Sequence, residues 1–320
     1  MSGQFFQDLG LPNPDHHLEA GSGSHAYQTA EILKRIEPVL VENQPRAVVV
    51  VGDVNSTIAG ALAAKKLGID VVHVEAGLRS GDRSMPEEIN RVATDAISDL
   101  FFVTEESGRS NLVREGIDPQ RIHMVGNVMI DSLRRHLEEA LRSEIRQRLM
   151  PQGGDYGLVT LHRPANVDET SKLTEILEAL NRIAGEVPLY WPVHPRSRAR
   201  LDGGVPLSPR LHLIEPLGYL DFLSLEAQSS VVFTDSGGIQ EETTVLGVPC
   251  LTIRENTERP VTIECGTNRL AGTTQSSILK AWDESKRNPK KGRVPPLWDG
   301  QAGERIHAVL RHEYLAAGCR

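Results

Sequence analysis

Cysteine is scarce in this chain, which has three in 320 residues: Cys250, Cys265 and Cys319. An odd and sparse set argues against a disulfide framework and fits a reducing compartment. None of the three belongs to a CxxC pair, so the sequence offers no usual ligand set for zinc. We therefore expect a cytoplasmic protein without a metal site.

Long apolar runs and an excess of positive charge are also missing. No apolar stretch approaches the roughly 20 residues of a membrane-spanning helix. The first residues, MSGQFFQDLGLPNPDHH, lack the basic start and apolar core of a signal peptide. The net charge of −8 gives no electrostatic reason to bind nucleic acid or an anionic membrane. These absences favour a soluble protein, in which a local basic pocket could still hold a phosphorylated small molecule.

Short β-rich apolar runs alternate with helical patterns through most of the sequence. A first series of predicted strands consists of 46–53, 69–77, 100–105 and 122–127. A second series consists of 156–163, 187–194, 211–216, 230–237 and 248–253. Repeated strand–helix units of this kind predict parallel sheets with helices on both faces.

The length and the two series predict two doubly wound α/β domains of the Rossmann-like class. The charged helical stretch RRHLEEALRSEIRQRLMPQGGD reads as the connection between them. We expect an N-terminal domain over 1–148, a C-terminal domain over 149–299 and a final helix within 300–320. Ligands of such sheets bind at the carboxyl ends of the strands, where most of the unusual polar residues fall.

The segment VVFTDSGGIQEE (231–242) joins a predicted strand to a predicted helix. Gly237 and Gly238 would let a ligand approach the backbone, and Ser236 with the first-turn N–H groups would face an anion such as a diphosphate. Glu242 could accept hydrogen bonds from ribose hydroxyls. A helix cap and a tight turn without a ligand explain the segment equally well. The pattern is neither a Walker loop nor GxGxxG, which disfavours ATP and dinucleotides.

Three motifs of the first series carry carboxylates. VGDVNST puts Asp53 at the end of a strand, and HVEAGLRSGD puts Glu75 at the end of the next. PEEINR places Glu87 and Arg91 one helical turn apart. Each alone has a structural explanation as a cap, a turn residue or a partner of the helix dipole. Together they predict a carboxylate cluster suited to proton abstraction and leaving-group departure.

The second series adds a histidine and an arginine. LHRPANVD ends a strand with His162 and Arg163, which we expect across a cleft from the carboxylates. A loop histidine with satisfied hydrogen bonds is the alternative. His194 in WPVHPRSR is a weaker candidate, and the arginines within 196–200 are expected on a solvated surface.

Nine motifs follow one another between about residues 20 and 315: VGDVNST, HVEAGLRS, PEEINR, VGNVMIDSL, TLHRPANVD, PVHPR, TDSGGIQEE, LGVPCLTIRENTERP and GTNRLAG. Each is weak alone, but jointly they are highly specific. Their order resembles that of the non-hydrolysing UDP-N-acetylglucosamine 2-epimerases.

That resemblance implies a GT-B-like fold, with two Rossmann-like domains facing a cleft that binds UDP and a C-terminal helix that crosses back to the first domain. It implies reversible conversion of UDP-GlcNAc to UDP-ManNAc without a metal or redox cofactor, supplying ManNAc for surface polysaccharides. These nucleotide sugars would be its partners, and a homodimer is expected. Nucleic acid and membrane are not.

The family mechanism gives each candidate a role. A base removes the C2 proton while UDP leaves C1, giving 2-acetamidoglucal, and UDP then adds back with the proton delivered to the other face. The implied catalytic residues are Asp53, Glu75, Glu87 and His162, the last near the diphosphate. The implied substrate- and UDP-binding residues are Arg91, which also supports Glu87, and Arg163, Phe222, Ser236, Gly237, Gly238, Glu242 and Arg259.

Two features depart from the family pattern. The family begins with a strand and a phosphate-facing GTRPE loop, whose Arg and a following Lys help to bind the nucleotide sugar. This segment has no counterpart before QFFQDLGL, so we expect an N-terminally truncated first domain and a poor enzyme from residues 1–320 alone. Leu217 stands where some members carry a Gln near the uracil, a contact that backbone groups could replace.

Three other functions stay open at this point. A GT-B glycosyltransferase would share the UDP site, although sugar transfer does not require a C2 proton to move. A hydrolysing epimerase would release UDP and free ManNAc. An inactive remnant that only binds UDP would also carry the second domain's motifs.

Overall fold

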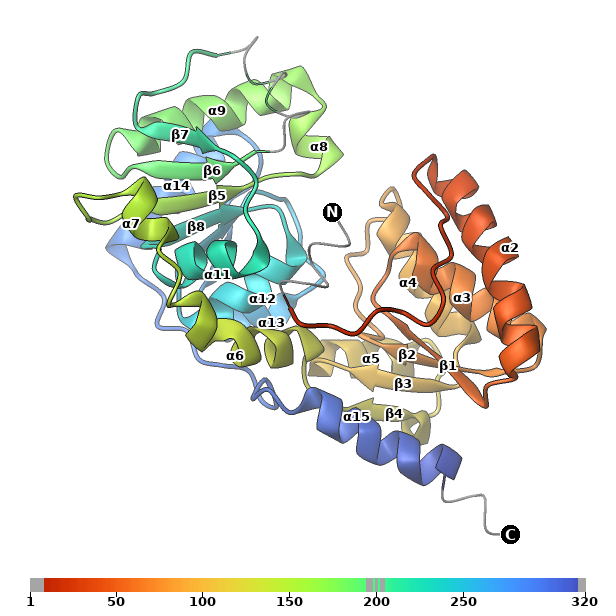
Figure 1. Ribbon diagram of the computed structural model, residues 1–320. Coiled ribbons are helices and arrows are strands. Elements are labelled where there is room, and N and C mark those ends of the chain that lie inside the picture. Colours follow the sequence, from red (N-terminus) through yellow and green to blue (C-terminus); the bar gives the residue numbers. More distant parts are fainter. Residues whose placement is uncertain (1–8, 194–197, 199–200, 202–204, 316–320) are drawn as a thin grey trace. The chain divides into compact units, whose positions relative to one another are not determined.

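The structure is a computed structural model that describes residues 9–193, 198, 201 and 205–315. The chain divides into two α/β units, whose elements are labelled in Figure 1. Unit 1 consists of residues 1–12 and 132–295, and unit 2 of residues 13–131 and 296–320. The boundary at residue 131 falls inside a helix, α6 (Val128–Ala140).

Unit 2 is built on parallel strands in the order β1-β2-β3-β4. In the described residues they are β1 (Ala47–Val51), β2 (Asp70–Val74), β3 (Leu100–Val103) and β4 (Ile122–Met124). The helices of this unit are α2 (His25–Asn43), α3 (Asn55–Lys66), α4 (Pro86–Ile97), α5 (Glu106–Arg114), η1 (Pro119–Arg121), α15 (Ala302–Leu310) and the π-helical turn η2 (Arg311–Leu315). Val50 pairs with His73, and Phe102 with His123, so the carboxyl ends of the strands meet at one edge of the sheet.

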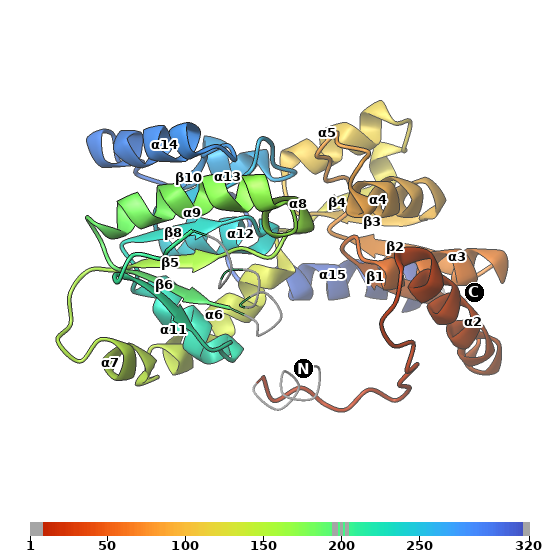
Figure 2. The same ribbon diagram turned by 90° about the horizontal axis from the view of Figure 1, so that it is seen from above.

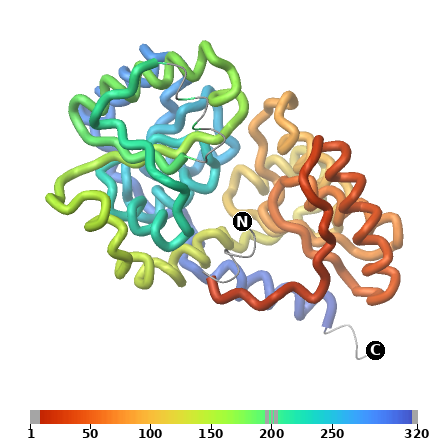
Figure 3. The backbone as a smooth tube through the Cα atoms, turned by 45° about the horizontal axis from the view of Figure 1, so that its top comes forward, coloured from red at the N-terminus to blue at the C-terminus, as the bar shows by residue number. Residues whose placement is uncertain are grey.

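Apolar side chains cover both faces of this sheet. Ala61 of α3 packs with Val71, and Ile306 of α15 packs with Val72 and Phe102. Consecutive strand residues point to opposite faces, so α3 and α15 cover different faces. Figure 3 traces this return of the chain, in which the blue end lies with the orange and yellow segments. Burial of both faces explains why β2 and β3 read as continuous apolar runs. The similar run 46–53 was expected to be a buried strand, but Val49 and Val51 of β1 are 46% and 50% exposed, because β1 pairs with β2 alone.

Unit 1 is built on a larger parallel sheet in the order β10-β9-β8-β5-β6-β7. Its described strands are β5 (Gly157–Thr160), β6 (Leu189–Pro192), β7 (Leu211–Ile214), β8 (Val231–Thr234), β9 (Cys250–Thr252) and β10 (Asn268–Leu270). Its described helices, besides α6, include α7 (Ile145–Leu149), α8 (Pro164–Val167), α9 (Thr170–Ala184), α11 (Tyr219–Ala227), α12 (Gly237–Leu246), α13 (Pro260–Glu264) and α14 (Gln275–Arg287).

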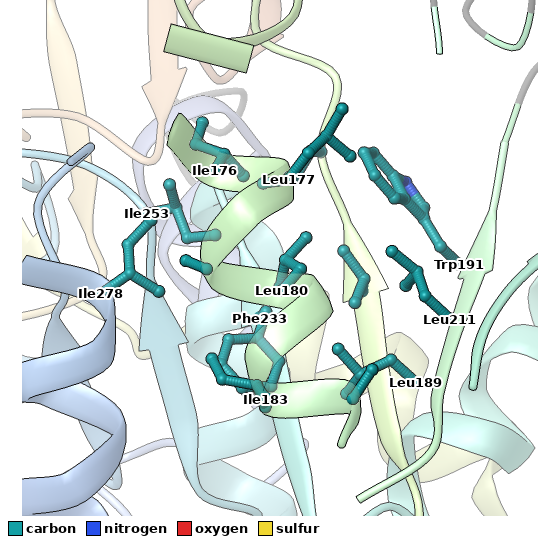
Figure 4. Packing of buried hydrophobic residues seen from close by; sticks show 14 of the residues in the cluster. Ile176, Leu177, Leu180, Ile183, Leu189, Trp191, Leu211, Phe233, Ile253 and Ile278 are labelled. Carbon is teal, nitrogen blue, oxygen red and sulfur yellow. The ribbon is translucent and has the colours of Figure 1, made fainter. Parts of the chain in front are cut away.

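Helices lie on both faces of this sheet as well. Figure 2 shows α9 and α14 on one face, with α7 and α11 on the other. Ile176, Leu180 and Ile183 lie one turn apart on α9 and pack with Leu189 and Phe233 of the sheet (Figure 4). This spacing is the amphipathic pattern that predicted the helix. The α/β class and the two parallel-sheet units are therefore confirmed.

The stretch 134–155 was expected to be helical and to connect two domains. Most of it forms α6 and α7, and it belongs to unit 1. Leu133 packs with Leu223 of α11, and Ile145 packs with Tyr156. Between its charged residues the stretch carries apolar residues at helical spacing, and these form a face that packs in the core of unit 1.

Candidate functional site

In unit 1 the Asp235 carboxylate joins the ends of β5 and β8. It accepts the backbone N–H groups of His162 at 3.1 Å and Arg163 at 3.0 Å, and the Nδ2 of Asn166 at 3.0 Å. The Nδ1 of His162 lies 3.0 Å from the same carboxylate. Asp235 is fully buried, whereas the His162 side chain is 63% exposed. The carboxylate thus fixes the loop and leaves the imidazole open to a ligand.

The ionisation of Asp235 follows from these contacts. Burial alone would raise its pKa, but the hydrogen bonds from His162, Arg163 and Asn166 outweigh burial and hold the pKa below the usual value of 3.8. The anion therefore persists at neutral pH beside His162. Sequence reasoning missed Asp235, although it stands in the quoted TDSGG motif.

Asp235→Asn is expected to lower the free energy of unfolding by about 1.5–3 kcal/mol near neutral pH, because hydrogen bonds to a charged group are lost. Because the native pKa of Asp235 is lowered, its carboxylate stabilises the fold at pH values above the pKa of the unfolded chain. This stabilisation is lost as the pH falls through the native pKa. The deficit should therefore shrink in acid. Urea unfolding at neutral and acidic pH measures it, with exposed Asp155→Asn as control. A deficit that stays constant with pH would contradict this role.

The first turn of α12 begins at Gly237, directly after Ser236 at the N-cap. The Ser236 side chain makes no cap hydrogen bond, so the simple cap explanation does not apply to its hydroxyl. A Cβ on Gly237 would lie 2.4 Å from Nη1 of Arg259 and 2.9 Å from Oε1 of Glu258. Gly237 was expected to give a ligand access, but it makes room for this ion pair. A guanidinium at a helix N-terminus still favours an anion there.

Arg259 belongs to a buried group of charges. Its Nε lies 2.8 Å from Glu241, and Glu258 contacts both Arg259 and Arg254. Arg163 approaches Glu258 at 3.6 Å. Three arginines face two carboxylates, which leaves one net positive charge.

The arrangement of these arginines suits phosphate oxygens, which guanidinium groups bind through several N–H donors. Within the described residues the buried Nη1 of Arg254 has no hydrogen-bond partner. Arg254, Glu241 and Glu258 were not singled out from the sequence, although the TIRENTERP and IQEE segments contain them.

Glu242 also belongs to α12 and lies five positions after Gly237, the first residue of this helix. It is 3% exposed and accepts the Tyr219 hydroxyl at 3.1 Å. Burial raises the pKa of Glu242 and outweighs the hydrogen bonds that lower it. Phe222 is partly buried and packs against the core cluster that includes Tyr156.

In unit 2 the end of β1 and the start of α3 place Asp53 beside α4. Nη2 of Arg91 forms an ion pair with the Asp53 carboxylate. Nδ2 of Asn90 donates a hydrogen bond to the backbone carbonyl oxygen of Asp53 at 2.9 Å. The Asp53 side chain keeps 25% exposure. Asp53 is thus oriented by two residues of one helix face and remains accessible to solvent.

Glu75 directly follows β2 and has an unusual backbone conformation. Its φ is +66°, in the left-handed region that residues with a Cβ rarely adopt. Its Oε2 lies 3.6 Å from the position that a Cβ on Gly52 would take. Strained conformations of this kind cluster at functional sites, where surrounding structure imposes them. The Glu75 side chain therefore approaches Gly52, the residue before Asp53 in the turn that follows β1.

The expected support of Glu87 by Arg91 is wrong. Arg91 forms its ion pairs with Glu88 and Asp53. Glu88 is buried and accepts the backbone N–H groups of Ser80 and Gly81, hydrogen bonds that overcome burial and lower its pKa. Arg91 follows Glu88 by three positions and Glu87 by four. Both spacings allow an ion pair on one helix face, so the sequence alone could not tell which glutamate pairs with Arg91.

Glu87 itself is partly exposed on the first turn of α4. Asn90 and Arg91 follow it by three and four residues, so all three share one helix face. Because Asn90 and Arg91 contact Asp53, Glu87 lies on the face of α4 that meets Asp53.

A buried charge network that sequence reasoning missed supports this end of the sheet. His73 of β2 contacts Asp95 through Nδ1 at 2.6 Å and the carbonyl of Gly52 through Nε2 at 2.8 Å. Asp95 also accepts the N–H of Gly77 and pairs with Arg79. Burial would raise the pKa of Asp95, but the His73 and Arg79 contacts lower it. The network fixes the turns that carry Asp53 and Glu75.

The predicted site residues fall into two groups, one in each unit. In unit 2 Asp53 and Arg91 form an ion pair, Glu75 approaches the neighbouring Gly52, and Glu87 lies on the helix face that carries Arg91. The unit 1 group is His162, Arg163, Phe222, Ser236, Gly237, Gly238, Glu242 and Arg259. His194 lies outside the described residues. In the part of the chain that the structure describes, no His, Cys, Asp and Glu side chains form a group that could hold a metal ion, and no helix is long and apolar enough to cross a bilayer.

Known proteins resemble this chain along most of its length. A profile of the family described as UDP-N-acetylglucosamine 2-epimerase matches residues 1–311. The UDP-N-acetylglucosamine 2-epimerase of Methanocaldococcus jannaschii is 44% identical over 318 residues, which cover 96% of this chain and 87% of the relative. The UDP-2,3-diacetamido-2,3-dideoxy-D-glucuronate 2-epimerase of Pseudomonas aeruginosa is 41% identical over 319 residues, 99% of this chain and 87% of that one.

Solved structures agree with the sequence relatives. The crystal structure of the M. jannaschii UDP-GlcNAc 2-epimerase in complex with UDP-GlcNAc and UDP has a TM-score of 0.90 at 44% identity. The match covers 98% of this chain and 88% of that protein. It confirms the predicted GT-B-like class, and the relatives confirm the predicted enzyme class. This chain belongs to the UDP-N-acetylglucosamine 2-epimerase family.

Proposed function

We propose that this chain interconverts UDP-GlcNAc and UDP-ManNAc by elimination and re-addition of UDP. The observation that carries the proposal is the approach of the Glu75 carboxylate to Gly52, the neighbour of Asp53 in the turn after β1, in a member of this family. Closely spaced carboxylates can serve as acid and base at one carbon.

The proposed reaction balances without an external reagent. A carboxylate among Asp53, Glu75 and Glu87 takes the C2 proton, and the C–H electron pair becomes the C1=C2 double bond. The C1–O bond breaks, and its electrons leave with UDP. In the return step a UDP oxygen attacks C1, and C2 receives a proton on its opposite face. The product differs from the substrate only in configuration at C2.

Unit 1 supplies the proposed UDP site. The N-terminus of α12 and the arginine group around Arg259 would hold the diphosphate, with exposed His162 beside it. Glu242 would accept the ribose hydroxyls, and Phe222 would contribute an apolar contact. Firm binding of UDP matters because a glycal released before re-addition ends the turnover unproductively.

Incubation with UDP-GlcNAc in deuterium oxide tests this proposal. We expect UDP-ManNAc that carries deuterium at C2. Mass spectrometry and proton NMR measure this incorporation. Free ManNAc with UDP would indicate a hydrolysing epimerase. Transfer of the sugar to an acceptor without deuterium at C2 would indicate a glycosyltransferase. Binding of UDP without any turnover would indicate an inactive remnant.

The P. aeruginosa relative gives a second candidate substrate of the same reaction class. Its named substrate carries a carboxylate and a second acetamido group, which would need their own polar partners. We propose UDP-GlcNAc as the better substrate, and kcat/KM for both sugars measures the preference. We also propose that the reaction supplies ManNAc for surface polysaccharide. We propose a homodimeric state and a cytoplasmic location as well.

A further inference from the structure

A second buried carboxyl group lies beside Glu242. Glu226, near the end of α11, is 0% exposed, and its carboxyl group interacts with that of Glu242, which is 3% exposed. Within the described residues neither carboxyl oxygen of Glu226 has an N–H or hydroxyl partner. Such a buried carboxyl group is unusual, because buried polar groups are almost always satisfied by donors.

Physical chemistry requires a proton between these two groups. An ionised carboxylate without donors is costly to bury, and two adjacent carboxylates in such a place cannot both ionise. The Tyr219 hydroxyl donates to Glu242, which favours the ionised form of Glu242. Glu226 has no such donor, so the proton resides on Glu226. Burial and the Glu242 charge both raise the pKa of Glu226 well above its usual value, in agreement with this geometry.

Among the described residues, no positively charged group is recorded as acting on the pair; His136 of α6 lies against the Tyr219 ring, and its Nδ1 contacts the Ser132 carbonyl. The titratable groups that act on the pair are Tyr219 on α11, Glu241 on α12 and the thiol of Cys250 on β9. The arginines of neighbouring segments pair elsewhere: Arg148 with Asp221, Arg146 with Gln228, and Arg259 with Glu241 and Glu258. A shared proton is therefore the remaining way to accommodate both carboxyl groups.

We propose that Glu226 is a positioning residue that, as a neutral acid, donates a hydrogen bond to Glu242 and holds its carboxylate ready to accept the UDP ribose hydroxyls. The inference rests on the proposed function, which assigns Glu242 to UDP. Donors from Tyr219 and Glu226 fix the carboxylate between two helices. The ribose then meets an acceptor that is already oriented and ionised, which reduces the ordering cost of binding.

UDP binding by two variants tests the donor role. Glu226→Gln keeps an N–H donor of similar shape and should bind UDP much as the wild type does. Glu226→Leu removes the donor and should weaken UDP binding roughly ten- to hundredfold, as expected for a hydrogen bond to a charged group. Isothermal titration calorimetry with UDP measures both, with exposed Glu178→Gln on α9 as control. Equal affinity of the Leu and Gln variants would overturn the inference.

Stability without ligand tests the proton directly. A raised native pKa means that the folded state keeps a proton that the unfolded chain releases above about pH 4.5. The stability that this proton gives the wild type is fully present below about pH 4.5 and is lost as the pH rises through the native pKa of Glu226. Glu226→Gln has no such proton, so its stability relative to wild type should increase with pH. A difference that does not change with pH would overturn the inference.

Glu242→Gln separates this inference from the proposed function. The variant is expected to lose UDP affinity. Unchanged affinity would overturn the assignment of Glu242 to UDP, and the inference with it. If Glu242→Gln loses affinity while Glu226→Leu does not, Glu226 alone has been misassigned and the proposed UDP site stands.

Discussion

Replacing Glu75 or Glu87 by Gln is expected to reduce turnover by about 10²–10⁴-fold, the usual contribution of a positioned acid or base. Gln preserves the size of each side chain but cannot accept or return a proton at neutral pH. The left-handed backbone at Glu75 is imposed by its surroundings and should survive the change. UDP affinity should be largely retained, because these residues lie in unit 2 and the proposed UDP site lies in unit 1.

The measurements are kcat and KM for UDP-GlcNAc, together with deuterium incorporation at C2. Glu42→Gln, an exposed change on α2, is the control. Glu88→Gln offers a sharper contrast within the same motif. Buried Glu88 holds the Ser80–Gly81 turn, so its loss should lower the melting temperature, whereas Glu87→Gln should not. Near-normal turnover in Glu75→Gln and Glu87→Gln would show that these carboxylates are structural.

Gly77→Ala is expected to destabilise unit 2 by about 2–5 kcal/mol. The φ of Gly77 is +79°, and the left-handed region costs an alanine about 1–2 kcal/mol. A Cβ there would also lie 2.2 Å from the carbonyl oxygen of Gly108, a backbone atom that cannot move without shifting α5. Overpacking of this kind adds about 1–3 kcal/mol. The sum approaches a large part of a domain's stability, which is about 5–15 kcal/mol.

Gly116→Ala is the matched control for this prediction. Its φ is +91°, but no atom lies within 4 Å of the added Cβ. It should therefore show the backbone cost without the steric cost. Urea unfolding of both variants, followed by circular dichroism, measures the difference. Equal losses in the two variants would mean that the Gly108 contact relaxes without cost.

The sequence by itself determined most of the regular elements and the location of the candidate residues. Apolar runs such as 69–77 and 230–237 predict buried parallel strands because both sheet faces are covered, and this pattern is local. Asp53 and Glu75 follow such strands, so their placement at the carboxyl edge of the sheet also follows from sequence. The family motifs then associated each residue with a chemical role.

Only the tertiary structure decided which side chains are partners. Arg91 selects Glu88 and Asp53 over Glu87, because the turn at Ser80 draws Glu88 inward. Asp235 and Glu226 acquire their roles from residues on other elements of the sheet and its helices, which no spacing along the chain encodes. Burial decides the charge of each: donors keep Asp235 ionised, and their absence keeps Glu226 protonated. Local periodicity therefore specifies the elements, whereas the environment created by packing specifies the chemistry of their side chains.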